Sequence, residues 1–261
     1  MQLQRQQDLQ VDSQEWDIPD IAVVSPTEML VCDFGEREVN LVNSTAGGVV
    51  ASVTVPGGPS RICLLSGMAA VSLTGKKIQF IRVGRGSLTL DRVLGVDKEI
   101  SGITTLDKSL VTSSTEPPGV TMMSMDGKLM YTVDNQTAGR EIFKYPDFLT
   151  SPRDGFIYVS DRGTNTVTKI DNKLNVLKTF TDPSLQNIYG ITSISGDQLL
   201  VCSYGNTSIV LLNPRTGNTT VLLGEQDGLK KPWALTYCHT QRKLFVTPSD
   251  LTTHIQVYKF V

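Results

Sequence analysis

The chain is poor in the residues from which metal centres, disulfide frameworks and many hydrolytic sites are built. Among its 261 residues there are only two histidines and four cysteines, namely Cys32, Cys63, Cys202 and Cys238. No two of these cysteines form a Cys-x-x-Cys pair, which argues against a zinc module or a disulfide framework and favours a reducing compartment. We therefore expect no metal, no cofactor and a cytoplasmic location.

Long apolar runs and an excess of one charge are also absent. No run approaches the ~18–20 apolar residues that are needed to span a bilayer. The first eight residues are polar and lack the apolar segment of a secretory signal. With 24 basic and 26 acidic residues the net charge is −2, which gives no reason to expect a polyanion or a membrane surface as partner.

The feature that is present is a repeat. An apolar phrase such as Met29–Asp33 returns six times, and a second apolar run begins eight or nine residues after each anchor residue. The interval between anchors is about 39 to 48 residues, which is typical of stacked or radially arranged repeat units. The six anchors are Val31, Ala70, Val111, Val159, Val201 and Val246.

Each repeat reads as four short strands separated by turn residues. The runs are β-branched and bounded by Gly, Pro, Asn or Asp, and no window sustains a 3.6-residue apolar period. Four antiparallel strands in this length are typical of a propeller blade, whereas a two-sheet sandwich does not explain six evenly spaced copies. The sequence therefore predicts an all-β, six-bladed β-propeller with four-stranded antiparallel blades. We place the blades at residues 17–57, 58–97, 98–140, 141–183, 184–226 and 227–261.

The last blade is short of one strand. Its third strand, at Ile255–Val261, would leave an open edge of unpaired backbone groups at the end of the chain. The only spare β-like residues are near Asp8–Val11 in the first segment, residues 1–16. We predict that this segment pairs with Ile255–Val261 and closes the ring.

Several blade signatures carry a family resemblance: Leu30–Gly35 with Val39–Val42, Ile157–Gly163 with Val167–Asp171, Thr179–Pro183 with Tyr189–Ile191, and Leu199–Gly205 with Ile209–Leu212. In these residues the chain resembles the NHL-type six-bladed propeller at the C-terminus of tripartite-motif (TRIM) proteins, especially the invertebrate ones. Blade three lacks the usual Asp-x-Gly, so the resemblance concerns the fold and the family neighbourhood rather than one ligand.

The resemblance implies a non-catalytic, substrate-recognition propeller of a ubiquitin ligase. In that family, zinc modules and a coiled coil precede the propeller and carry out or organise ubiquitin transfer. No zinc-ligand spacing of that kind occurs in this chain, so we expect no enzymatic activity here. The expected partners are proteins, and oligomerisation is expected only through a coiled coil upstream.

Partners of propellers usually bind where the loops between the second and third strands meet the loops between blades. Exposed aromatic residues anchor many protein interfaces, and Phe34 and Tyr204 occupy equivalent positions just after the second strand. The alternative is that both rings pack between blades. The predicted partner-binding residues are Phe34, Arg37, Lys76, Lys77, Arg162, Tyr204, Asn206, Lys230 and Lys231.

RNA binding is the first alternative, since these loops contain lysines and arginines together with Phe34, Tyr204 and Trp233 as stacking surfaces. The same loops carry at least as many acidic residues, so the release of counter-ions would be weak. Trp233 follows Pro232 at the start of a strand, which favours packing between blades.

A calcium-dependent lactonase or esterase propeller is the second alternative. Such an enzyme needs oxygen ligands that converge in the channel, and Asp33, Asp161, Asn165 and Asn206 are the candidates. Blades two, three and six offer Ser72, Ser113 and Pro248 at the position matched to Asp33, which leaves the ring incomplete. Both histidines fall in blade six, and no Gly-x-Ser-x-Gly elbow or Cys/His pair is evident.

Overall fold

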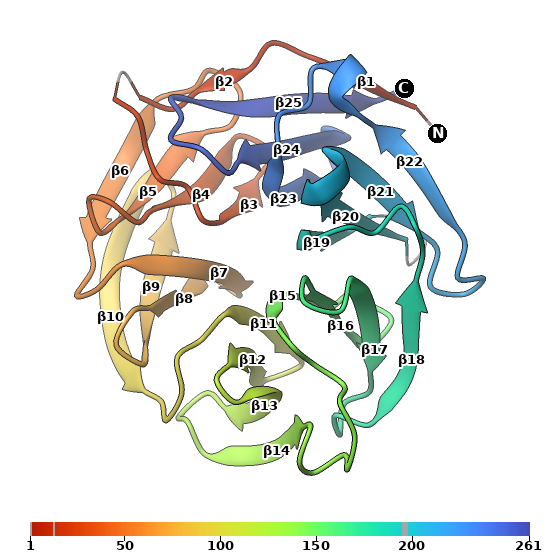
Figure 1. The fold of residues 1–261 in the computed structure, drawn as a ribbon. Coiled ribbons are helices and arrows are strands. Elements are labelled where there is room, and N and C mark those ends of the chain that lie inside the picture. Colours follow the sequence, from red (N-terminus) through yellow and green to blue (C-terminus); the bar gives the residue numbers. More distant parts are fainter. Residues whose placement is uncertain (1, 13, 195–197) are drawn as a thin grey trace.

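The computed structural model describes residues 2–12, 14–194 and 198–261, and it contains six antiparallel sheets. The sheets stand around a central axis as the blades of a propeller, and the first strand of each blade is innermost (Figure 1). Consecutive innermost strands contact one another around the ring. The predicted all-β, six-bladed fold with four-stranded antiparallel blades is therefore confirmed.

The first three blades each run from the centre outward in chain order. Their strands are short and bounded by turns, as the β-branched runs predict. Blade one contains β3 (Ile21–Ser25), β4 (Glu28–Asp33), β5 (Glu38–Asn43) and β6 (Val49–Thr54). Blade two contains β7 (Pro59–Leu65), β8 (Met68–Leu73), β9 (Lys77–Gly84) and β10 (Ser87–Gly95). Blade three contains β11 (Gly102–Leu106), β12 (Ser109–Thr115), β13 (Pro118–Ser124) and β14 (Leu129–Asp134).

Blades four to six follow the same order. Blade four contains β15 (Pro146–Thr150), β16 (Ile157–Asp161), β17 (Thr166–Ile170) and β18 (Val176–Thr181). Blade five contains β19 (Ile188–Ser193), β20 (Leu199–Ser203), β21 (Ser208–Leu212) and β22 (Thr219–Leu223). Blade six contains β23 (Pro232–Cys238), β24 (Lys243–Pro248) and β25 (His254–Phe260). Among the described residues, helix is confined to short 3₁₀ turns such as η2 (Tyr204–Asn206) and η3 (Glu225–Asp227), and none could cross a bilayer.

The N-terminal segment closes the ring, as predicted, but it uses two short strands instead of one. The pairing of β2 (Leu9–Gln10) with Ile255 and His254 lies in the predicted segment. The additional strand β1 (Leu3–Arg5) pairs with Tyr258–Phe260, so almost the whole edge of β25 is covered. Leu9 and Val11 are buried in a cluster with residues of blades one and six. The closing segment therefore contributes core packing as well as backbone hydrogen bonds.

The strand register corrects the repeat alignment in two blades. The residue of the second strand that pairs with the first-strand residues Ile62 and Ile103 is Val71 in blade two and Thr112 in blade three, one position later than Ala70 and Val111. The physical reason is that both faces of these second strands are buried, so consecutive residues are apolar and no alternation fixes the register. The positions equivalent to Asp33 are consequently Leu73 and Ser114, not Ser72 and Ser113.

The core is a ring of apolar contacts between neighbouring blades. The four cysteines are free and buried within these contacts, where desolvation raises the pKa of the Cys32 and Cys202 thiols. They behave as small apolar side chains.

Candidate functional site

Bulges at the start of four inner strands, β7, β15, β19 and β23, lie at the mouth of the central channel. The pairing of β15 with β16 shifts between Pro146 and Phe148, which leaves Asp147 in the bulge. Equivalent shifts occur at Tyr189 in β19 and at Trp233 in β23. Because a bulge redirects the extra side chain, these residues point away from the regular strand rows.

Arg61, the third residue of β7, crosses the mouth of the channel. Its guanidinium Nε donates to the carbonyl of Asp147 at 3.2 Å, and Nη1 donates to the carbonyls of Pro19 and Ser60 at 3.2 and 2.9 Å. The Cζ atom lies 3.8 Å from the centre of the Phe148 ring. These contacts join blade two to blade four, which are not neighbours in the ring. Burial lowers the pKa of Arg61, and the carboxylates of Asp20 and Asp147 oppose this effect.

Asp147 is the carboxylate that holds the second guanidinium of the mouth. Its Oδ2 accepts a hydrogen bond from Arg162 Nε at 2.5 Å. Burial raises the pKa of Asp147, while the charges of Arg162 and Arg61 act in the opposite direction. Arg162 in turn lies over the Tyr145 ring, with Cζ 4.4 Å from its centre. The guanidinium plane is thus fixed between a carboxylate and an aromatic ring.

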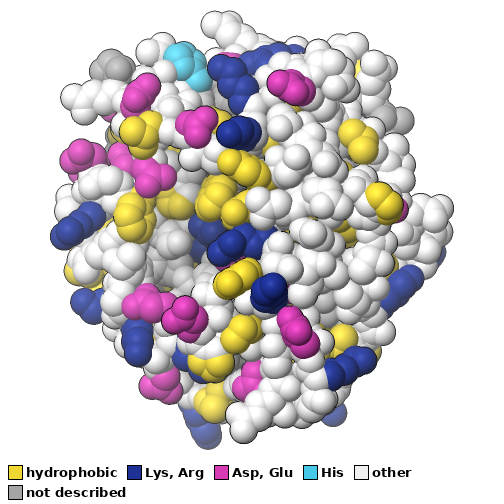
Figure 2. Space-filling model, in the orientation of Figure 1, with side chains coloured by type: hydrophobic (Ala, Val, Ile, Leu, Met, Phe, Trp, Pro, Cys, Tyr) yellow, Lys and Arg dark blue, Asp and Glu magenta, His cyan; other side chains and the backbone are white. Residues whose placement is uncertain are grey.

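Aromatic residues continue this arrangement across blades four, five and six. The Tyr189 and Trp233 rings are stacked with centres 4.1 Å apart, and Tyr204 meets Tyr189 edge-on at 5.5 Å. The Lys231 ammonium lies 5.8 Å from the centre of the Tyr204 ring. We call Tyr145, Arg162, Tyr189, Tyr204, Lys231 and Trp233 the mouth cluster. In Figure 2, Lys and Arg side chains gather with hydrophobic ones at the centre of the viewed face, over the inner strands.

A polar cavity of about 340 Å³ lies along the inner strands, with Arg61 and Asp20 in its lining. Asp20 is buried, and its two carboxylate oxygens accept hydrogen bonds from the backbone N–H groups of Ile21 and Ile62 at 2.9 and 3.0 Å. Desolvation raises the pKa of Asp20 to about 6, although the Arg61 charge and these hydrogen bonds favour the ionised form. The channel therefore contains a buried acid whose ionisation falls near neutral pH.

Three of the predicted partner-binding residues, Arg162, Tyr204 and Lys231, come together in the mouth cluster. Trp233 packs against the core of blades four to six, as its position beside Pro232 predicts, and also stacks on Tyr189. Tyr204 is partly buried against the same core, so its ring both packs and borders the mouth.

The remaining predicted residues do not join this cluster in the interactions that the structure shows. The Phe34 ring is 40% exposed and lies against Gly58, where an added Cβ would stand 2.5 Å from the ring. Arg37 and Lys76 occupy equivalent left-handed turns before β5 and β9, with φ of 58° each, and Lys77 begins β9.

Asn206 and Lys230 are held by structural contacts. The Asn206 side-chain amide donates to the carbonyls of Pro183 and Ser184, at 3.5 and 3.3 Å. The Lys230 backbone N–H donates to Gln256 Oε1 at 3.1 Å. Asn206 therefore fixes the segment that connects blades four and five, and Lys230 belongs to the connection into blade six.

Sequence reasoning missed Arg61, Asp147, Tyr145 and Tyr189. Each stands at the beginning of an inner strand or just before it, and not in the loops between second and third strands on which the prediction concentrated. A usable signal was present, because a charged residue within the first residues of a buried inner strand is unusual, and Arg61 and Asp147 directly precede the apolar Ile62 and Phe148.

The carboxylates proposed as calcium ligands serve the turns of their own blades. Asp161 accepts backbone hydrogen bonds from four residues, including Tyr145 at 3.0 Å and Gly163 at 2.9 Å. Asp33 accepts from Gly35 and Glu36 in the same way. Within residues 2–12, 14–194 and 198–261, no group of three or more His, Cys, Asp or Glu side chains is arranged to hold a metal ion.

The histidines lie at opposite ends of blade six. His239 is in the turn between β23 and β24, where its ring meets Tyr237 edge-on at 4.8 Å. His254 begins β25, and its Nδ1 is 2.5 Å from the Thr253 hydroxyl. They therefore do not form a shared pair.

Comparison with known proteins identifies the fold and no family. No model of a known protein family matches the chain, and no curated protein sequence matches it. Among solved structures, the chain is similar to a catalytically inactive virginiamycin B lyase from Staphylococcus aureus bound to quinupristin, with a TM-score of 0.71, 15% identity and full coverage of both chains. A streptogramin B lyase gives a TM-score of 0.69 with 12% identity over 98% of this chain and 97% of that one. The WD40 propeller domain of Doa1 gives 0.67 with 13% identity over 99% and 97%. At these identities the likeness concerns the β-propeller fold alone.

Proposed function

We propose that this protein is a non-catalytic recognition propeller that binds a protein partner over the mouth of its central channel. The observation that carries this proposal is the mouth cluster, in which Arg162 and four aromatic rings are held in fixed contact at one face. Arginine, tyrosine and tryptophan are the residues that dominate protein interfaces. Because their positions are already fixed by the fold, binding would require little additional ordering.

The proposal extends to the role that the sequence resemblance suggests, which is substrate recognition for a tripartite-motif type ubiquitin ligase. The support for this role is the set of NHL-like blade signatures in blades one, four and five together with the fold. The solved structures of similar fold include both a WD40 domain and lyases, so fold alone does not select between recognition and catalysis. The turn-forming role of Asp33 and Asp161 favours recognition over a calcium-dependent hydrolase.

Affinity capture with the double variant Arg162→Ala, Tyr204→Ala tests the proposal. We expect the wild-type protein to retain specific partner proteins after nuclease treatment, and the variant to lose them by a factor of about ten or more, since interface anchors are commonly worth over 2 kcal/mol. The matched control is Arg85→Ala, Tyr131→Ala, which removes an exposed arginine and an exposed tyrosine from outside the mouth.

Both variants are first compared with the wild type by thermal unfolding, so that a loss of folding is recognised. The same proteins recovered with the wild type and with the mouth variant would contradict the proposal. Partners that disappear after nuclease treatment would transfer the assignment to a nucleic acid.

A further inference from the structure

The junction between blades two and three differs from the other five in one respect. Elsewhere the segment that leads into an inner strand inserts a fully buried apolar side chain between blades. In blades four, five and six this buried residue stands six positions before Leu149, Ile191 or Leu235, which is the inner-strand residue that pairs with a valine of the second strand. At the junction between blades two and three the residue equivalent to Val55 is Val96, seven positions before Ile103. Val96 and the following Ile100 are only partly buried, and Asp97 beside them is exposed. The buried residues at the other five junctions are Ile18, Val55, Phe143, Leu185 and Leu229.

A second difference lies on the second strand of blade three, opposite this connecting segment. In each blade, one inner-strand residue, Ile103 in blade three, pairs with an equivalent position of the second strand. That position is valine in five blades and Thr112 in blade three. The row continues through Thr121 of β13 and Thr132 of β14, which pair in register with Thr112. Blade three thus presents three threonines in line to a connecting segment that is itself charged. The junction therefore combines a connecting segment whose apolar residues are only partly buried with a second strand in which a threonine stands where the other blades have valine.

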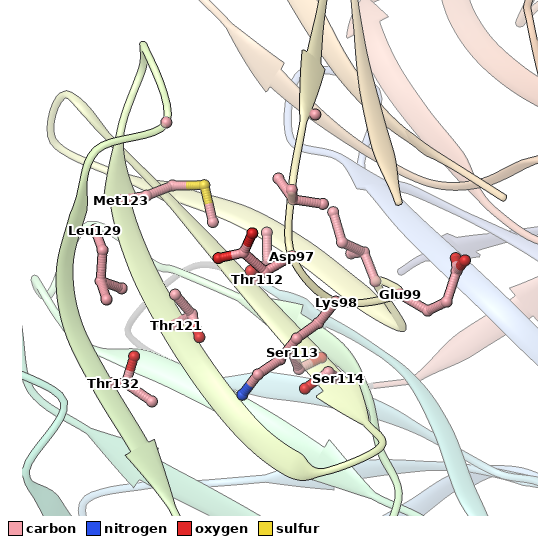
Figure 3. Close-up of a pocket in the computed structure, with 14 residues that line it drawn as sticks. Asp97, Lys98, Glu99, Thr112, Ser113, Ser114, Thr121, Met123, Leu129 and Thr132 are labelled. Carbon is pink, nitrogen blue, oxygen red and sulfur yellow. The ribbon is translucent and has the colours of Figure 1, made fainter. Parts of the chain in front are cut away.

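A cavity of about 180 Å³ lies at this junction, between the segment at residues 95–100 and the face of blade three. Figure 3 shows Lys98 extending across it toward Ser113 and Ser114, while Met123 and Leu129 lie at the other end. Among the described residues, the hydroxyls of Thr112, Thr121 and Thr132 make no hydrogen bond, and Asp97 and Lys98 form no ion pair within 4.0 Å. The hydroxyls of Ser113 and Ser114 donate to the carbonyls of Pro146 and Pro117. The cavity is therefore lined by both polar and apolar side chains, and the three threonine hydroxyls are free to bind a ligand.

Two side chains of opposite charge border the cavity, with the Asp97 carboxylate near Met123 and the Lys98 ammonium at the other side (Figure 3). Asp97 supplies a carboxylate beside the Thr112 hydroxyl, and Lys98 supplies an ammonium group. Hydrogen bonds from Thr137 lower the pKa of Asp134, and the positive charge of Lys98 adds to this effect. A ligand that carries both an ammonium and a carboxylate would be matched by these groups, and an apolar side chain would be matched by Met123 and Leu129.

We propose that this cavity binds a small amphipathic zwitterion, namely an α-amino acid with an apolar side chain. Its carboxylate contacts Lys98 with the hydroxyls of Thr121 and Thr132, its ammonium contacts Asp97 and Thr112, and its side chain lies against Met123. The volume is suitable, because a cavity of about 150 Å³ already accepts a ligand of benzene size. The site shares no residue with the mouth cluster, so this inference does not depend on the proposed function.

Titration of the whole protein with L-leucine and two analogues tests the inference. Leucinamide lacks the carboxylate and N-acetyl-leucine lacks the ammonium. We expect saturable binding of leucine by calorimetry or ligand-observed NMR, with a Kd on the order of 0.1–10 mM for so small a ligand. Each analogue should bind at least about tenfold more weakly, since it leaves one charged group of the site without a partner.

Two variants locate the binding. Asp97→Leu with Thr112→Val places apolar side chains at both positions, as Leu185 and Val201 do in blade five. This filled variant should not bind leucine, and its melting temperature should equal or exceed that of the wild type. Lys98→Met should weaken binding about tenfold or more, and Lys108→Met, an exposed lysine in the turn between β11 and β12, serves as its matched control.

Absence of saturable leucine binding at 20 mM, roughly twice the weakest expected Kd, would overturn the inference. So would undiminished binding to the filled variant, which would place the ligand elsewhere. Equal binding of N-acetyl-leucine would overturn the zwitterion assignment, because the carboxylate of Asp97 would then have no role.

Discussion

At the scale of single residues, the channel mouth brings two carboxylates and two guanidiniums together where water is scarce. Two of these charges have partners that are remote in sequence: Arg61 reaches carbonyls of blades one and four, and Asp20 accepts an N–H from blade two. Such pairs are expensive to form and more expensive to break, because removal of one partner leaves the other buried and unpaired. Their value here is geometric, since they fix the side chains that border the mouth.

Asp20 should make the stability of the protein depend on pH. Burial raises its pKa from 3.8 to about 6, so folding favours the protonated acid. This contribution is fully present below about pH 4 and is lost as the pH rises through about 6, and over that window it amounts to about 3 kcal/mol. We therefore expect Asp20→Asn to gain stability relative to the wild type by about this amount between pH 4 and pH 7, measured by urea unfolding.

The comparison uses the difference between variant and wild type because other carboxyl groups titrate in the same range. Asp147, whose pKa burial also raises, is unchanged in both proteins. The exposed Asp17→Asn is the control for removing a carboxylate outside the channel. A constant difference for Asp20→Asn would show that Asp20 is ionised throughout.

Two buried tyrosines should respond in opposite ways to loss of the hydroxyl. The Tyr258 hydroxyl is buried with no hydrogen-bond partner among the described residues, whereas the Tyr158 hydroxyl donates to Asp154 at 2.8 Å. We expect Tyr258→Phe to raise the free energy of unfolding by about 1 kcal/mol and Tyr158→Phe to lower it by about 1 kcal/mol. Denaturant unfolding measures both, and a loss of stability in Tyr258→Phe would mean that its hydroxyl has a partner.

Part of the candidate site could be predicted from the sequence and part could not. Arg162 and Tyr204 were found because loops between second and third strands converge at one face of a propeller, and Lys231 was found because the connections between blades meet the same face. Arg61 and Asp147 escaped because their roles depend on contacts across the channel, between blades two and four. The composition of a strand does not reveal which distant carbonyl its arginine will reach.

At the scale of strands, the repeat was readable because turn residues bound every apolar run. The register of β8 and β12 could not be predicted, because strands that are buried on both faces carry apolar residues at consecutive positions. In blade one, Asp33 followed by a glycine turn fixes the end of β4, whereas blades two and three have no acid there. A slip of one residue exchanges the two faces of a strand, and it concealed Thr112 as the exception in a row of valines.

The closing strands β1 and β2 should be essential for stability. Deleting residues 1–14 would expose the edge of β25 and the pockets of Leu9 and Val11, so we expect the melting temperature to fall by at least several degrees, with a tendency to aggregate. Differential scanning calorimetry and light scattering check this expectation. Unchanged thermal stability in the truncated protein would refute the closure.

A point variant separates packing from strand pairing in the same segment. Leu9→Ala should lower the free energy of unfolding by about 2–3 kcal/mol, because Leu9 is 5% exposed and the cavity left behind can collapse only in part. The exposed neighbour Gln7→Ala is the control and should change it by less than about 0.5 kcal/mol. Equal effects of the two changes would indicate that β2 contributes backbone pairing alone.

At the scale of the whole molecule, the net charge is close to zero and acidic residues lie among the basic ones, which limits the ligands that the channel face can bind. Calcium should have no specific effect, since Asp33 and Asp161 already accept several backbone hydrogen bonds each. We expect 5 mM calcium, compared with EDTA, to change the melting temperature by less than about 1 °C, because only a ligand that binds the folded state stabilises it. A saturable rise would favour the hydrolase alternative.

Nucleic acid should bind weakly and without a steep dependence on salt. The net charge is −2, and the predicted basic residues are divided between two regions, with Arg37, Lys76 and Lys77 on blades one and two and Arg162 and Lys231 at the mouth. Fluorescence anisotropy with a single-stranded RNA of about ten nucleotides should show little binding at 150 mM salt. The slope of log K against log salt should be much shallower than that of an extended basic groove, which contributes about −0.7 for each phosphate contact.

The double variant Lys76→Glu, Lys77→Glu should then leave RNA binding unchanged, and it should also leave the capture of protein partners intact. Tight binding with a steep slope that this double variant abolishes would replace the protein-recognition assignment with an RNA-binding one, because it would show that Lys76 and Lys77 act together on a phosphate backbone.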